Sequence, residues 1–127
     1  MKNGRIIIQA GRKPWPHELR VANILALAGH DVEFLPESSV KTADILVDGK
    51  RFEIKSPESF NPNTLEHTIK DALKQAPNII IDSSRIRKIK DEKVYNYLMR
   101  KAYDYPQIKK LVFVTKKGRI IDISELI

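Results

Sequence analysis

The 127-residue sequence contains no cysteine, and no apolar run approaches the roughly 18 residues that a membrane-spanning helix needs. The absence of cysteine excludes a disulfide scaffold, a cysteine-based zinc site and a thiol nucleophile. The charged, apolar and cleavage-site pattern of a secretory signal peptide does not open the chain, and internal repeats, low-complexity tracts and linkers are also lacking. Residues 1–127 are therefore predicted to form a single domain without a membrane-spanning segment.

Positive charge is concentrated in the second part of the chain. Residues 1–82 hold 11 basic and 11 acidic side chains, whereas residues 83–127 hold 12 basic and five acidic ones, which accounts for the net charge of +7. Such an excess suits a polyanion-binding surface, because each neutralised phosphate releases counterions. Arg87, Lys88, Lys116 and Lys117 are the predicted nucleic-acid contacts, with a solvated basic surface as the alternative. Five aromatic residues could stack on bases, although ordinary packing explains most aromatics at this frequency: Trp15, Tyr95, Tyr97, Tyr103 and Tyr105.

Hydrophobic patterning predicts that helices and strands alternate along the chain. Helices are expected over residues 16–28, from a cap at Asn63 or Thr64 to about Gln75, and over residues 91–103. Strands are expected over residues 5–9, 32–35, 42–47, 51–56, 78–82, 110–115 and 119–123. Three consecutive isoleucines at 79–81 suit a strand that is buried on both faces. The order predicts an α/β fold, a single-domain αβα sandwich with a central mixed sheet.

The dipeptide Asp48-Gly49 is a strong hairpin signal, and it predicts the pairing of the two strands beside it. With these residues in the turn, paired positions sum to 97, so that Asp44 faces Glu53. One face of the hairpin then carries an apolar set suited to a core: Ala43, Ile45, Val47, Phe52 and Ile54. The other face carries Asp44, Glu53 and Lys55. A turn shifted by one residue is the alternative, and it would pair Asp44 with Lys55 as an ordinary ion pair.

Two opposed carboxylates repel each other, because the β-carbons of a cross-strand pair lie only about 4.5–5.5 Å apart. A divalent cation offsets this repulsion, and Mg²⁺ or Mn²⁺ prefers carboxylate oxygens with water completing an octahedron. Lys55 lies two residues beyond Glu53 on the same face, within reach of a phosphate. Glu18, at the edge of the apolar stripe of the first helix, is the third predicted metal ligand beside Asp44 and Glu53. The alternative for Glu18 is a first-turn acid that the helix dipole stabilises.

The order of Glu18, Asp44 and Glu53-Ile54-Lys55, on helix, strand and paired strand, resembles the PD-(D/E)XK nuclease superfamily. Over roughly residues 16–82 the closer resemblance is to the tRNA-cleaving domain at the C-terminus of CdiA-type contact-dependent growth inhibition toxins. It rests on four segments: His17-Glu18 through Gly29-His30-Asp31-Val32, Ala43-Asp44-Ile45-Leu46-Val47-Asp48-Gly49, Phe52-Glu53-Ile54-Lys55-Ser56-Pro57, and Lys74-Gln75-Ala76 through Asn78-Ile79-Ile80-Ile81-Asp82. Ala43 stands where the superfamily usually has proline, which leaves the predicted ligands unchanged.

The resemblance implies a PD-(D/E)XK-like, metal-dependent ribonuclease that cleaves tRNA, the toxic C-terminal domain of a larger secreted protein. Glu18, Asp44, Glu53 and Lys55 would be the catalytic residues. The cofactor would be Mg²⁺, or Mn²⁺ or Zn²⁺, which activates water while Lys55 orients it or stabilises charge on the phosphoryl group. Such a toxin would act in the target-cell cytoplasm and have a cognate immunity protein, acidic to match the basic surface. Two alternatives stay open: a DNA endonuclease of the restriction or junction-resolving kind, and a non-catalytic nucleic-acid-binding module.

Overall fold

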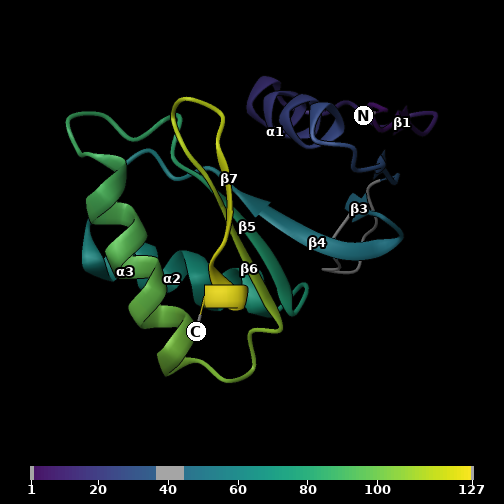
Figure 1. Ribbon diagram of the computed structural model, residues 1–127. Helices are drawn as coiled ribbons and strands as arrows, with labels where there is room; N and C mark the ends of the chain where they lie inside the picture. Colours follow the sequence, from purple (N-terminus) through teal and green to yellow (C-terminus); the bar gives the residue numbers. More distant parts are fainter. Residues whose placement is uncertain (1, 37–44, 127) are drawn as a thin grey trace.

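The structure is a computed structural model that describes residues 2–36 and 45–126 (Figure 1). Within these residues, three helices and seven strands follow the order that hydrophobic patterning predicts. The helices are α1 (Pro16–Leu27), α2 (Pro62–Leu73) and α3 (Asp91–Asp104), and a short 3₁₀ helix spans Ile123–Leu126. The strands are β1 (Ile6–Ile8), β2 (Val32–Phe34), β3 (Ile45–Val47), β4 (Lys50–Lys55), β5 (Asn78–Asp82), β6 (Lys110–Val114) and β7 (Ile120–Asp122).

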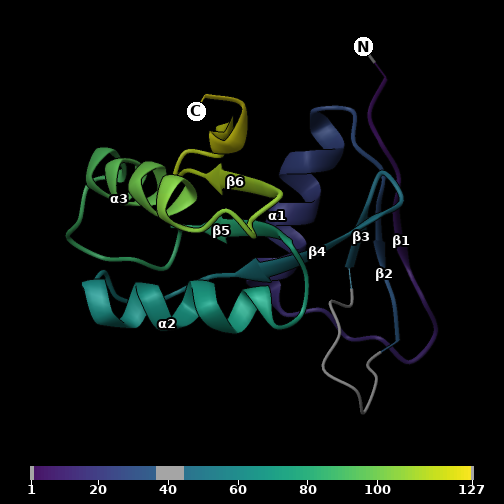
Figure 2. The same cartoon turned by 90° about the horizontal axis from the view of Figure 1, so that it is seen from below.

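The seven strands form one mixed sheet, in the order β1 to β7. The pairs β1/β2, β4/β5 and β5/β6 are parallel, whereas β2/β3, β3/β4 and β6/β7 are antiparallel. In Figure 2, β4 extends from the group of β1–β3 to the group of β5 and β6 and so joins the two parts of the sheet. The predicted mixed sheet is therefore confirmed.

Helices cover both faces of this sheet. Buried side chains of α1, such as Val21 and Leu25, belong to the same apolar cluster as Phe52 and Ile54 of β4 and Ile80 of β5. A second cluster joins α2 and α3 to the opposite face, where Ile79 and Ile81 of β5 lie. These three isoleucines are 0–1% exposed, which confirms that β5 is buried on both sides. The arrangement is an αβα sandwich, and no helix in the described residues is long and apolar enough to cross a membrane.

Most element ends differ from the predictions by one or two residues, and two of the differences have a structural reason or add an element. The predicted cap of the second helix at Asn63 or Thr64 is wrong, because Asn61 is the cap and α2 begins at Pro62. The side chain of Asn61 accepts a hydrogen bond of 3.0 Å from the backbone N–H of Asn63, and proline suits the first helical position because that position needs no N–H donor. At the C-terminal end, β7 stops at Asp122, and the 3₁₀ helix that follows it is not predicted.

Candidate active site

The β3–β4 hairpin has the predicted register. Ile45 pairs with Phe52, Leu46 with Arg51 and Val47 with Lys50. Asp48 and Gly49 form the turn with φ angles of 51° and 81°, the positive values that a two-residue hairpin turn of the favoured type requires. The shifted turn, which would have paired residue 44 with Lys55, is therefore excluded for the described residues of this hairpin. Asp44 itself lies outside the described residues, so its position opposite Glu53 stays a prediction.

Glu53 and Lys55 come together near the end of β4. The Glu53 side chain is 10% exposed, and its Oε2 lies 3.7 Å from Nζ of Lys55, whose side chain is 29% exposed. Phe52 and Ile54 point into the α1 cluster, so alternation along the strand places Glu53 and Lys55 on the α2 face. Glu53 pairs with Ile79 and Lys55 with Ile81, both on this face. A nearly buried carboxylate is thus held beside a cation that is partly open to solvent.

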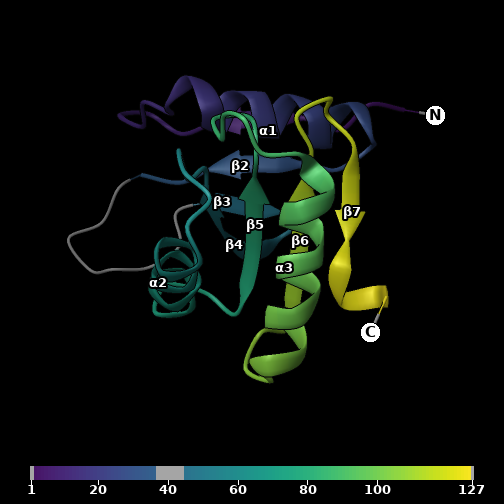
Figure 3. The same ribbon diagram turned by 90° about the vertical axis from the view of Figure 1, so that its left-hand side faces the viewer.

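A buried carboxylate, Asp82, organises the same edge of the sheet. It lies at the end of β5, is fully buried, and accepts four hydrogen bonds. Nη1 of Arg20 donates at 2.8 Å, the hydroxyl of Ser56 at 2.9 Å, and the N–H and hydroxyl of Ser84 at 3.0 and 2.9 Å. Because Ser56 directly follows Lys55, this network ties α1 to the segment that carries Lys55. In Figure 3, α1 lies across the end toward which the β5 arrow points.

Glu18 lies in the first turn of α1, at this same edge. Its Oε2 lies 3.2 Å from Nη2 of Arg12, whose side chain is almost fully buried, and its Oε1 accepts a hydrogen bond of 2.9 Å from the backbone N–H of Trp15. The second contact stabilises the start of the helix, as the alternative interpretation of Glu18 predicts. Because α1 covers the face opposite α2, Glu18 and Glu53 approach the edge from opposite sides of the sheet.

Among the described residues, no group of three or more histidine, aspartate or glutamate side chains is placed to hold a metal ion. Glu53 supplies one buried carboxylate, and Arg12 and the cap of α1 engage Glu18. The predicted set of Glu18, Asp44 and Glu53 therefore depends on Asp44. Oxygen donors of this kind fit Mg²⁺ or Mn²⁺, which need few protein ligands because they keep several waters.

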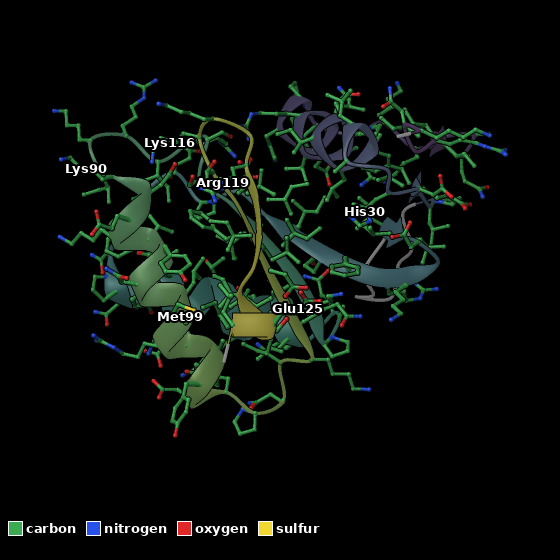
Figure 4. The ribbon with its side chains drawn as sticks, viewed as in Figure 1. His30, Lys90, Met99, Lys116, Arg119 and Glu125 are labelled. Carbon is green, nitrogen blue, oxygen red and sulfur yellow. The ribbon has the colours of Figure 1, made fainter. Side chains whose placement is uncertain are left out.

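The four predicted nucleic-acid contacts lie on two loops at one end of the molecule. Arg87 and Lys88 are exposed between β5 and α3, and Lys117 is exposed in the β6–β7 turn. Lys116 differs, because its Nζ lies 2.7 Å from the carbonyl oxygen of Ile89 and 3.1 Å from Oδ1 of Asp91. Figure 4 shows Lys116 and Lys90 near the start of α3. Lys116 thus fastens the β6–β7 turn to α3.

Asp91 accepts the hydrogen bonds that link the β6–β7 turn to the start of α3. Burial by itself raises the pKa of Asp91. Its carboxylate, however, accepts hydrogen bonds from the Ser83 hydroxyl and from the backbone N–H and the ammonium of Lys116. These hydrogen bonds and the charge of Lys116 outweigh burial and lower the pKa below its ordinary value. Asp91 is therefore ionised at neutral pH.

Sequence patterning does not identify Asp82 or Arg20 as members of the site. Their contact joins residues 62 positions apart, so only the fold brings them together. A weaker signal is present: Asp82 ends a strand of three isoleucines and precedes Ser83-Ser84. In open α/β sheets, polar residues at the carboxyl ends of parallel strands commonly face a ligand crevice.

The chain matches the family model described as "Contact-dependent growth inhibition CdiA C-terminal domain" over residues 41–120. Among solved structures it is similar to a chain of the "CdiA-CT/CdiI toxin and immunity complex from Burkholderia pseudomallei", with a TM-score of 0.72 and 21% identity, covering 94% of this chain and 98% of that one. At this identity the likeness establishes the fold alone. No curated protein sequence matches the chain. Because the family model spans more than half of its length, the protein belongs to the CdiA C-terminal domain family of contact-dependent growth inhibition.

Proposed function

We propose that this toxin domain is a metal-dependent ribonuclease of the PD-(D/E)XK type that cleaves tRNA. The observation that carries the proposal is the nearly buried Glu53 carboxylate, which lies 3.7 Å from the Lys55 ammonium near the end of β4. If the register of β3 and β4 continues by one more residue pair, Asp44 faces Glu53. Membership of a growth-inhibition family agrees with it, because destruction of tRNA stops protein synthesis in the recipient cell.

In this proposal Asp44 and Glu53 hold one divalent cation, Mg²⁺ or in its place Mn²⁺ or Zn²⁺. Once bound, the cation would supply Lewis acidity toward the phosphodiester and lower the pKa of the attacking water. The nearly buried position of Glu53 strengthens its attraction for a cation, because water screens charges less there than at the surface.

Lys55 serves the chemical step. Its ammonium is partly exposed and lies beside the carboxylate that is proposed to hold the cation, so a phosphate docked at this edge would meet it directly. There it stabilises the negative charge that grows on the phosphoryl oxygens. The Asp82 network fixes its backbone, because the Ser56 hydroxyl bonds to a fully buried carboxylate.

Glu18 has a supporting role in the proposed site. Arg12 and the N–H of Trp15 hold its carboxylate at the start of α1. From that position it would contribute through a bridging water rather than by direct contact with the other two carboxylates.

The proposed substrate surface consists of the exposed basic residues on the β5–α3 loop and the β6–β7 turn. Arg87, Lys88 and Lys117 would contact phosphates, whereas Lys116 would contribute mainly its field, because Asp91 and Ile89 already engage its ammonium. Each lost phosphate contact lowers the slope of log affinity against log salt by roughly 0.7 to 0.9.

We further propose a protein partner and a delivery route. The similar Burkholderia pseudomallei chain is part of a toxin and immunity complex, so an immunity protein is the expected partner of this domain. An acidic surface on that partner would complement the net charge of +7. The domain would travel as the end of a larger secreted protein and act in the cytoplasm of the target cell.

The test is incubation of the purified domain with total tRNA, with other RNA and with plasmid DNA, each with Mg²⁺, with Mn²⁺ and with EDTA. Cleavage of tRNA that requires a divalent ion is the expected result. Cleavage of DNA alone would replace the proposal with a DNA endonuclease. Binding without cleavage of any polymer would replace it with a non-catalytic module. Full activity in EDTA would refute the metal mechanism.

A further inference from the structure

Trp15 is one of the large hydrophobic side chains that are strongly exposed in the described part of the chain, with 66% of its surface open to solvent. It directly precedes α1, and its backbone N–H donates to Glu18 at 2.9 Å. Because Pro16 follows it, Trp15 is restricted to extended backbone, and its φ and ψ of −67° and 154° agree. The indole therefore projects from a fixed backbone position rather than from a mobile loop.

The ring of His17 supports this indole. The two ring planes are parallel within 6°, and the centroids lie 6.4 Å apart. A broad π surface is thus offered to solvent at the edge of the sheet where Arg20, in the next turn of α1, bonds to Asp82 beside Ser56. Lys55 precedes Ser56, so the aromatic platform and the proposed catalytic lysine share this edge.

A positively lined groove begins next to the platform. It has a volume of about 690 Å³ and lies between α1, from Pro16 to Leu27, and the β6–β7 turn, where Lys117 and Gly118 line it. Arg20, Lys116 and Lys117 line it, and none of its described lining residues carries a carboxylate. Asp82 and Asp91 pair with Arg20 and Lys116, so the exposed Lys117 is the cation that a phosphate in the groove would meet. An aromatic platform at the mouth of a basic groove is the arrangement that binds single-stranded nucleic acid, with bases on the ring and phosphates along the groove.

We propose that Trp15, supported by His17, stacks on an unpaired base of the RNA substrate, and that the phosphates beside this base follow the groove toward Lys117. This inference rests on the proposed function and deepens it: the substrate must present a single-stranded segment, such as an unpaired end or a loop of tRNA. A fully paired helix keeps its bases stacked on one another and offers no ring to the indole.

Trp15 is the only tryptophan of the chain, so its fluorescence reports on this site directly. The full 127-residue protein is titrated in EDTA with an unstructured RNA 10-mer, with a duplex RNA of the same length and with inorganic polyphosphate. Saturable quenching by the single strand, and much weaker quenching by the other two, is the expected result. Equal quenching by polyphosphate, or none by the single strand, would overturn the proposal.

Variants separate stacking from charge. Binding of a fluorescently labelled single-stranded RNA 10-mer should weaken by about 5- to 100-fold in Trp15→Ala and far less in Trp15→Phe, which keeps a ring. Leu126→Ala is the control, because Leu126 is a large hydrophobic side chain that is 55% exposed on the 3₁₀ helix and does not line the groove, so its loss should leave binding unchanged. If Trp15→Ala binds the RNA as tightly as the unmodified protein but loses its immunity protein, the surface is a protein interface and the proposal fails.

This test is independent of catalysis because it contains no metal. A chain that cleaves tRNA without quenching would retain the nuclease proposal and refute the stacking. If the single strand binds and quenches the Trp15 fluorescence but no RNA is cleaved, the stacking proposal is retained and the nuclease proposal is refuted.

Discussion

Two lysine–carboxylate pairs in this molecule have the same separation but different surroundings. In β4, Lys55 and Glu53 lie 3.7 Å apart with side chains 29% and 10% exposed. At the C-terminal end of α2, the capping residue Lys74 and Asp71 also lie 3.7 Å apart, with side chains 70% and 61% exposed. Water screens the α2 pair almost completely, so it contributes little to stability. The β4 pair is screened less, so its charges exert a stronger field on whatever enters the site. Distance alone therefore does not distinguish a functional pair from a surface pair.

The largest expected effect comes from breaking each pair in turn. Glu53→Gln and Lys55→Met should each reduce single-turnover RNA cleavage by about 100-fold or more, because each removes charge that acts on the transition state. Asp71→Asn and Lys74→Met make the same chemical changes in the α2 pair and should leave the rate unchanged. Gel-based cleavage of tRNA in Mg²⁺ measures all four variants.

Binding separates the role of Lys55 from that of the surface cations. Lys55→Met should retain nearly full affinity for RNA in EDTA, since its effect belongs to the chemical step. Equal loss of activity in both pairs would mean that the variants act through general electrostatics, and the assignment of the β4 pair to catalysis would fail.

The hairpin was predictable because its determinants are local. Asp48-Gly49 accepts the positive φ angles of the turn, and the alternating apolar residues beside it fit only one register against the core. The layers were predictable for the same reason, since the isoleucine run of β5 has no suitable place except between two helical layers.

The Asp82 network was not predictable, because it is made by contacts between distant parts of the chain. Arg20 and Ser56 meet Asp82 only after α1, β4 and β5 have packed together. The role of Lys116 was hidden likewise: a count of charges identifies it as basic, but only the fold shows that Ile89 and Asp91 engage its ammonium. Charge patterning thus indicates that a basic surface exists and not which lysines are available to a ligand.

A second prediction sharpens the contrast between buried and exposed carboxylates through stability. Asp82→Ala removes the acceptor of four hydrogen bonds from a fully buried position and leaves Arg20 without its carboxylate. The free energy of unfolding should fall by about 3–5 kcal/mol, the range for breaking one side of a buried pair. Urea unfolding followed by circular dichroism measures it. A loss as small as that of Asp71→Asn would show that the Asp82 network is not a structural support.

A third prediction concerns Asp91, which is intermediate in exposure, and its dependence on pH. Because the folded-state pKa of Asp91 is lowered, its ionised form stabilises the fold above the ordinary pKa of 3.8, and this stabilisation is lost as the pH falls through the lowered value. Asp91→Asn should therefore cost about 1.5 kcal/mol at pH 7, as for a hydrogen bond to a charged group, and progressively less below pH 3.8. Unfolding of both proteins across pH 2–7 tests this. A difference that is constant with pH would assign the loss to packing.

The smallest expected effect reverses its sign between the two regions. If Asp44 faces Glu53 as the register predicts, Asp44→Asn relieves repulsion in the metal-free protein and should raise the free energy of unfolding by about 0.2–1 kcal/mol. Asp71→Asn instead removes a favourable pair on α2 and should lower it by about 0.2–0.5 kcal/mol. Added Mg²⁺ should then stabilise the unmodified protein more than Asp44→Asn, because the variant has lost a ligand. Thermal melts of the unmodified protein and of both variants in EDTA, and of the unmodified protein and Asp44→Asn in Mg²⁺, measure these differences. A lower melting temperature for Asp44→Asn in EDTA would mean that a cationic group, rather than Glu53, faces Asp44, and the proposed metal site would lose its second carboxylate.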